Sequence, residues 1–171
     1  MSNPPLPDKA EDALKLLGVA FKRLDDGSLL VDGDLDLGQK NLKKLPDLTN
    51  VIVTGHFFCR YNYLTSLKGS PQTVGGSFFC NGNKLLSLKH APEEVGKDFF
   101  CNNNQDLKDL EHAPQQFQKL ESDLGNFRSW DDVPDHLRIS AASKARQIAE
   151  GMSALSRPVK ALRRPSFGNR I

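Results

Sequence analysis

The sequence predicts an α+β repeat solenoid of about four to five coils with one parallel β-sheet face. A helix-hairpin cap is expected at its N-terminus, and a helix followed by a tail at its C-terminus. The main observation is an internal repeat, because Phe-Phe-Cys recurs at 57–59, 78–80 and 99–101, a spacing of 21 residues. An Asn and two leucines follow each copy at nearly constant distances. Periods of 20–29 residues are typical of solenoids, in which each repeat packs mainly on its neighbours.

Residues 1–30 are expected to cover the N-terminal end of the stack. We expect Asp8 to cap a helix that Gly18 ends. Its apolar positions are Ala10, Ala13, Leu14, Leu16 and Leu17. Residues 21–24 and 29–31, joined by Asp-Asp-Gly-Ser, are typical of a β-hairpin.

The solenoid itself is expected over residues 31–127. A degenerate copy begins at Val31, 22 residues before Val53, and a worn final copy begins near Phe117. Within each copy the segment L/F-x-L/C-x-x-N-x-L-x-x-L precedes a proline. This pattern resembles bacterial-type leucine-rich repeats, and its Phe-x-Cys-x-x-Asn variant is similar to short repeat proteins of bacteria and their phages. The resemblance implies a binding role, such as inhibitor, adaptor or effector, and names no single activity.

Alternation along a strand separates the residues of each repeat into an inner and an outer set. The predicted inner set is Phe57, Cys59, Leu64, Leu67, Val74, Phe78, Cys80, Leu85, Leu88, Val95, Phe99, Cys101, Leu107 and Leu110. Asn62, Asn83 and Asn104 are expected to turn inward and to bind backbone groups where each strand bends away. This predicts a structural role for the asparagines.

The outer set contains a row of three aromatic residues, Phe58, Phe79 and Phe100. Exposed aromatic patches often mark protein-binding surfaces. The predicted partner-binding residues are His56, Phe58, Arg60, Phe79, Asn81, Phe100 and Asn102. Two alternatives stay open: the N-terminal segment or a helix over 140–155 covers the row, or the rings only stack on one another and stabilise the sheet.

Residues 128–155 are expected to form a C-terminal cap and helix. Phe127, Trp130 and Val133 are placed to close the last coil, and apolar residues recur at helical spacing over 140–155. Residues 156–171 are predicted to be a disordered basic tail. Basic residues are concentrated at this end of the sequence, so the net charge of +2 divides into about −5 for residues 1–137 and +7 for the rest.

The tail suggests an alternative function, that of a nucleic-acid-associated protein. Its predicted electrostatic contacts are Arg157, Lys160, Arg163, Arg164 and Arg170. An anionic membrane surface, an acidic protein and the chain's own acidic body are further possible partners for these cations.

No catalytic residue, cofactor or metal ligand is expected. The sequence lacks the phosphate-binding loop, nucleophile-elbow and zinc-protease motifs, so an enzyme is not predicted. Asp32, Asp34 and Asp36 begin like a calcium loop, but Leu37 and Lys43 stand where its Gly and bidentate Glu belong. The cysteines are expected to be buried apolar side chains.

His90 and His112 are equivalent turn residues and lack a third ligand. The chain has no long apolar run and no classical signal peptide, so we expect a cytoplasmic protein, with delivery into a host cell left open. Its oligomeric state is not predicted.

Overall fold

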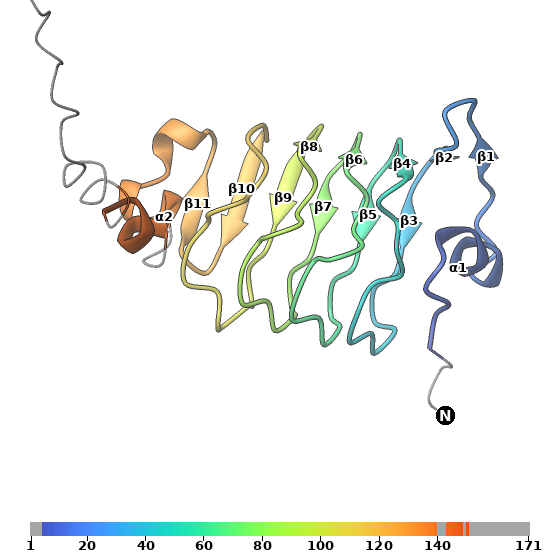
Figure 1. The fold of residues 1–171 in the computed structure, drawn as a ribbon, viewed down its shortest axis with the longest axis horizontal. Helices are drawn as coiled ribbons and strands as arrows, with labels where there is room; N and C mark the ends of the chain where they lie inside the picture. The colour runs from blue at the N-terminus through green and yellow to red at the C-terminus, as the bar shows by residue number, and fades with distance from the viewer. Residues whose placement is uncertain (1–4, 140–142, 149, 151–171) are drawn as a thin grey trace, which may run out of the picture. The chain divides into compact units, whose positions relative to one another are not determined.

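The computed structural model describes residues 5–139, 143–148 and 150. Residues 5–139 contain a β-solenoid of about four coils, and each complete coil contributes one strand to each of two sheets (Figure 1). The first sheet contains β1 (Lys22–Arg23), β2 (Leu29–Val31), β4 (Val51–Val53), β6 (Thr73–Val74) and β8 (Glu94–Val95). The second contains β3 (Leu35–Asp36), β5 (Phe57–Phe58), β7 (Phe78–Phe79), β9 (Asp98–Phe100), β10 (Lys119–Ser122) and β11 (Gly125–Phe127).

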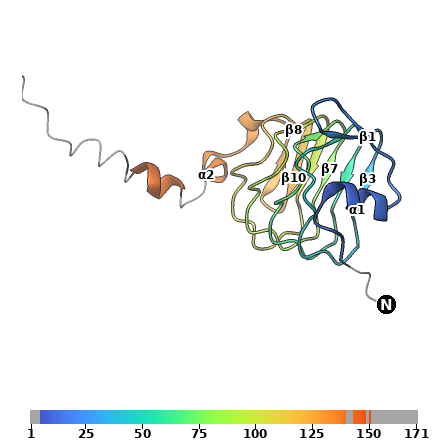
Figure 2. The same cartoon turned by 45° about the vertical axis from the view of Figure 1, so that its right-hand side comes forward.

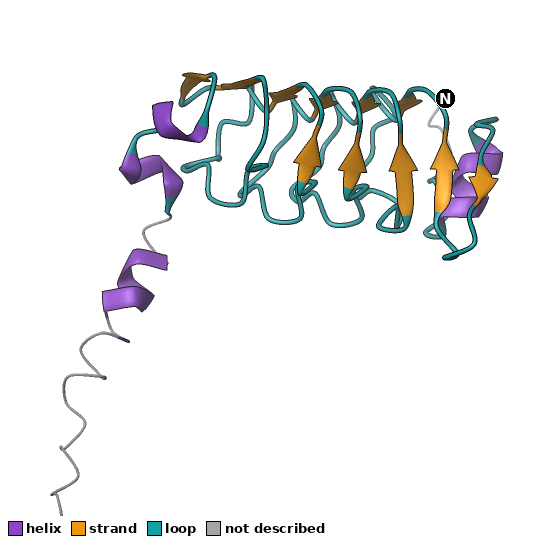
Figure 3. Ribbon diagram, turned by 90° about the horizontal axis from the view of Figure 1, so that it is seen from above, coloured by secondary structure: helices purple, strands orange, loops and turns teal. Residues whose placement is uncertain are grey.

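The second sheet is the parallel face that the sequence predicted. Its register pairs Leu35 with Phe57, Phe57 with Phe78, Phe78 with Phe99, and Phe99 with Leu120. The repeat of 21–22 residues therefore equals one coil. The two sheets lie along different sides of the coils (Figure 3).

The first sheet was not predicted as a sheet. Its strands in the repeats are two or three residues long, and only one position in each, Val53, Val74 and Val95, carries a recurring apolar residue. They are recognisable only from their pairing between coils, for example Val53 with Val74 and Val74 with Val95.

The predicted inner set is confirmed, because every one of its members is buried. Phe57, Phe78 and Phe99 are inaccessible to solvent and stack in the interior, with ring centroids 5.1 and 5.4 Å apart. The same core includes Cys59, Cys80 and Cys101, together with the leucines that follow them in each repeat. Burial of these repeated apolar ladders stabilises the stack.

A short helix and a hairpin lie at the N-terminal end of the solenoid (Figures 1 and 2). Helix α1 (Ala10–Leu16) buries Ala10, Ala13 and Leu14. The expectation that Asp8 caps this helix is wrong, because the N-cap is Lys9 and the Asp8 carboxylate instead pairs with Lys44 at 2.6 Å. Leu16 belongs to the helix, as expected, but it is 57% exposed and does not join the buried face. Strands β1 and β2 form the antiparallel hairpin.

The C-terminal end of the solenoid is closed by chain reversal. Strand β11 turns back antiparallel to β10, and the 3-10 helix Trp130–Asp132 and helix α2 (Asp135–Arg138) follow. Val133 and Leu137 are buried, and the Leu110 amide donates to the Leu137 carbonyl at 2.7 Å. These contacts cover the last coil.

Residues 143–148 are helical and belong to a separate compact unit. The other part of the helix expected over 140–155 and the whole basic tail over 156–171 lie outside the described residues. Within the described part of the chain, no helix has the length and apolar character needed to cross a membrane.

Candidate functional site

The outer surface of the second sheet carries a row of stacked phenylalanines. Phe58, Phe79 and Phe100, here called the aromatic ladder, follow one another on β5, β7 and β9. Their ring centroids are 4.7 and 4.6 Å apart, and the planes of each neighbouring pair differ by 16° and 6°. All three side chains are half-buried.

The stacking determines which part of each ring meets solvent. Centroid spacings of 4.6–4.7 Å match the distance between neighbouring strands, so the ring faces lie against one another along the sheet. The ring edges are therefore the parts that form the outer surface. These edges carry the positive side of the aromatic quadrupole, whereas the negative faces of neighbouring rings lie against one another.

Cations lie beside the ladder. The Arg60 guanidinium is 4.9 Å from the centroid of Phe58 and 5.8 Å from that of Phe79. At the other end the Lys119 ammonium is 5.8 Å from the centroid of Phe100 and pairs with Glu121 at 2.6 Å. Cation–π contacts of this kind hold long side chains against the rings.

His56 is held in place by hydrogen bonds on the same face. Its backbone amide donates to Asp34, and its Nδ1 atom accepts a hydrogen bond of 2.9 Å from the Ser77 amide. Its ring centroid is 5.9 Å from Phe58 and 6.0 Å from Phe79. An accepting Nδ1 requires the neutral imidazole with its proton on Nε2, which leaves Nε2–H as the available donor.

The structure brings all seven predicted partner-binding residues together. Strand register places His56, Phe58 and Arg60 on one coil, with Phe79 and Asn81, and then Phe100 and Asn102, on the next two. All seven are half-buried. The Asn81 side-chain oxygen is enclosed and has no donor among the described residues, which is unfavourable for a polar atom.

The sequence left open whether the aromatic ladder is covered by another segment or only stacks on itself. Stacking between the rings is present. The N-terminal segment does not cover the row, because α1 buries its apolar residues at the end of the solenoid core. The expected cover by the helix over 140–155 falls partly outside the described residues.

Sequence reasoning missed three exposed apolar side chains. Tyr61, Tyr63 and Leu86 are 51%, 49% and 63% exposed. A Cβ atom on Gly82 would lie 2.5 Å from the Tyr61 ring, so this ring covers the glycine of the next coil. The available signal in the sequence was the aromatic pair in Tyr61-Asn62-Tyr63, where the next two repeats have Gly82-Asn83-Lys84 and Asn103-Asn104-Gln105.

The asparagine ladder is structural, as expected. Asn83 is buried, accepts a hydrogen bond from the Leu64 amide and donates to the Cys59 and Cys80 carbonyls, each at 3.0 Å. Asn62 and Asn104 make equivalent bonds one coil away on either side. Each amide group therefore connects two coils.

The cysteines form a buried ladder of free thiols. Burial raises the pKa of the Cys59, Cys80 and Cys101 thiols above its ordinary value, which disfavours the nucleophilic thiolate. Among the residues that the structure describes, no cluster of three or more His, Cys, Asp or Glu side chains is arranged to hold a metal ion.

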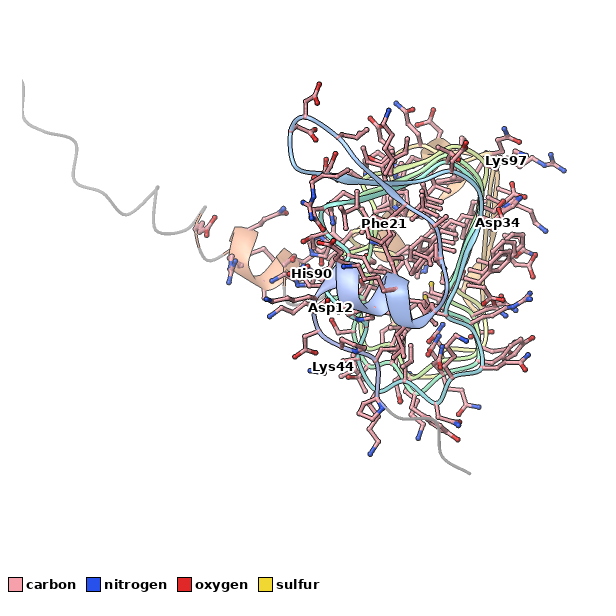
Figure 4. The ribbon with its side chains drawn as sticks, turned by 90° about the vertical axis from the view of Figure 1, so that its right-hand side faces the viewer. Asp12, Phe21, Asp34, Lys44, His90 and Lys97 are labelled. Carbon is pink, nitrogen blue, oxygen red and sulfur yellow. The ribbon has the colours of Figure 1, made fainter. Side chains whose placement is uncertain are left out.

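The acidic and histidine motifs occupy different sides of the coils. Asp34 lies beside the sheet of the aromatic ladder, whereas His90 lies on another side of the cross-section (Figure 4). His90 and His112 have φ angles of 70° and 69° and line a surface pocket of about 450 Å³ with Glu93. The aromatic ladder and its flanking residues are the strongest candidate site, because they gather aromatic and cationic side chains on one outer face.

Comparison of the chain with protein-family models, with curated proteins and with solved structures finds no match.

Proposed function

We propose that this protein is a non-catalytic protein-binding module whose working surface is the aromatic ladder with His56, Arg60, Asn81 and Asn102. The single observation that supports the proposal is the position of the ladder on the outer face of a rigid sheet. Aromatic and arginine side chains contribute most strongly to protein interfaces. Here both occur together on one face, with Arg60 against Phe58.

The rigidity of the surface also favours binding. Ladder side chains that are already stacked lose little conformational freedom when a partner binds, which lowers the entropic cost of association. Hydrogen bonds between successive coils hold the backbone beneath them, including Cys59 amide to Phe79 carbonyl at 2.8 Å. The surface is preorganised.

The resemblance to leucine-rich repeats of bacteria and phages agrees with this role. We therefore include three roles in the proposal: inhibitor, adaptor or effector. The protein would act in the cytoplasm or after delivery into a host cell. The repeat class itself does not identify the partner.

Affinity purification tests the proposal with the full chain as bait. Lysate of the cells that naturally express the protein is treated with nuclease and passed over wild type, Phe79→Asp and Leu86→Asp. Leu86 is the matched control, since it is an exposed apolar residue outside the ladder. We expect a stoichiometric partner to be retained by wild type and Leu86→Asp, and lost by Phe79→Asp.

A second variant keeps this test decisive if Phe79→Asp does not fold by circular dichroism. Phe79→Ala removes the middle ring of the ladder without placing a charge on the sheet. Retention of the same partner by a folded Phe79→Asp variant, or by Phe79→Ala in its absence, would overturn the proposal.

The alternative function is nucleic-acid binding through Arg157, Lys160, Arg163, Arg164 and Arg170. The specific observation in its favour is the concentration of positive charge at this end of the sequence. It predicts binding of duplex DNA or RNA that weakens steeply as salt is added. Replacing Arg163 and Arg164 by Gln in the full chain is expected to weaken such binding and to reduce its salt dependence, while Phe79→Asp leaves it unchanged.

A further inference from the structure

We propose that the partner presents a segment in which a lysine or arginine is followed by a short apolar run. The basic side chain lies beside Asp34 and Asp36, and the apolar side chains lie along the ring edges of the aromatic ladder. This inference rests on the proposed function and adds the chemistry of the partner.

The two ends of the ladder differ in charge. Strand register places Asp36 next to Phe58 at one end and Glu121 next to Phe100 at the other. Glu121 is paired with Lys119. Asp34 and Asp36 are exposed, and within the described part of the chain no cation lies within ion-pair distance of either. Among the described residues Arg60 is the one cation beside Phe58 at this end, so the two carboxylates leave a net negative charge at the β3 end.

Both carboxylates are held in position yet keep one oxygen available. One oxygen of Asp34 accepts a hydrogen bond of 2.6 Å from the His56 amide, and one oxygen of Asp36 accepts a bond of 2.7 Å from the Gly38 amide. No described donor lies within hydrogen-bond distance of the second oxygen of either side chain. An ammonium or guanidinium group is the donor that suits two such oxygens best.

The length of the ladder sets the length of the apolar run. Three rings at spacings of 4.7 and 4.6 Å extend over about 9 Å. An extended peptide rises about 3.3 Å per residue, so about three residues cover the ladder. A basic residue at one end of that run reaches the carboxylates on β3.

A different explanation exists for the two carboxylates. Strand β3 is the last strand of its sheet, and charged side chains on an edge strand prevent pairing with another chain. Removal of their charge separates the two explanations. Asp34→Asn/Asp36→Asn keeps the oxygens that accept the backbone hydrogen bonds, so its local structure is preserved.

The test uses the full chain and two short synthetic peptides. One peptide has two arginines followed by the apolar run Phe-Val-Phe, and its twin has Glu in place of Arg. Amide NMR locates the contact surface, and titration gives Kd at low and moderate salt. The control Asp12→Asn/Asp25→Asn makes the same charge change at exposed positions of α1 and the β1–β2 turn.

We expect the basic peptide to shift the amides of Phe58, Phe79 and Phe100, and to bind at least tenfold more tightly than its twin. Asp34→Asn/Asp36→Asn is expected to weaken binding at least fivefold and to flatten its salt dependence. The control pair is expected to change Kd less than twofold.

Equal binding of both peptides at the ladder would overturn the inference and leave the proposed function standing. Unchanged affinity of the Asp34→Asn/Asp36→Asn variant, with self-association in its place, would assign the carboxylates to edge protection and also overturn it. Absence of any ladder response would overturn the inference, and the affinity purification with Phe79→Asp would then decide the proposed function separately.

Discussion

Phe79 stacks on Phe100 with ring centroids 4.6 Å apart and planes only 6° from parallel. The neighbouring residue Phe78 makes a similar stack with Phe99, but on the opposite side of the sheet and without contact with solvent. One Phe-Phe dipeptide therefore serves both the core and the outer surface.

This pair gives a direct test of the face assignment. Phe78→Ala empties a position in the core and is expected to lower the free energy of unfolding by about 4 kcal/mol. Phe79→Ala removes two ring stacks on a half-buried face, and we expect a loss of about 2 kcal/mol. Urea unfolding of both variants checks the order, and a larger loss for Phe79→Ala would contradict the assignment.

The asparagines of the same coil give a second matched pair. Asn83→Ala leaves the Leu64 amide and the Cys59 carbonyl without their side-chain partner in the interior, so we expect a loss of about 3 kcal/mol. Asn81→Ala removes an amide whose oxygen is already unpaired, and its expected loss is below about 1 kcal/mol. Thermal or urea unfolding measures the free energy lost in each variant. Equal losses for Asn83→Ala and Asn81→Ala would contradict a structural role for Asn83.

The buried thiols predict a loss of stability at alkaline pH. Burial raises the folded pKa of Cys80, so the folded state keeps a proton that the unfolded state releases above about pH 8.5. Stability is therefore unaffected by this thiol below that pH and falls as the pH rises above it. Urea unfolding at pH 8, 9 and 10 measures the effect, and we expect a smaller decrease for Cys80→Ala than for wild type.

Reactivity of the same thiols offers an independent check. A thiol-specific reagent at pH 8 is expected to modify none of the three cysteines in the folded protein and all of them in urea. Rapid modification of Cys80 in the folded state would show that the core opens far more readily than its packing implies.

Close approach of successive coils predicts sensitivity at Gly76. A Cβ atom there would lie 2.7 Å from the Gly55 carbonyl group, a backbone contact that cannot move aside easily. We expect Gly76→Ala to cost about 2 kcal/mol, whereas Thr73→Ala, at an exposed position of the same coil, costs less than about 1 kcal/mol. Urea unfolding compares the two, and a neutral Gly76→Ala would show that the coils can separate at this corner.

The repeat length, the inner ladders and the position of the aromatic ladder could all be predicted from the sequence. These features depend on local rules, because alternation assigns Phe57 and Phe58 to opposite faces whatever lies beyond them. A repeat of 21 residues then places equivalent side chains one above another. The inward asparagines followed from the same reasoning, since they recur where each strand must bend.

The first sheet, the start of α1 and the orientation of the aromatic rings depend on contacts between distant parts of the chain and could not be predicted. A strand such as Thr73–Val74 has only one recurring apolar residue and is defined by its pairing with other coils. The Asp8 carbonyl accepts a hydrogen bond of 2.7 Å from the Asp47 amide, and the Asp8 carboxylate pairs with Lys44, 36 residues away. The rings expose their edges because neighbouring strands bring them within stacking distance, a spacing set by backbone hydrogen bonds between coils and not by the sequence of any one coil.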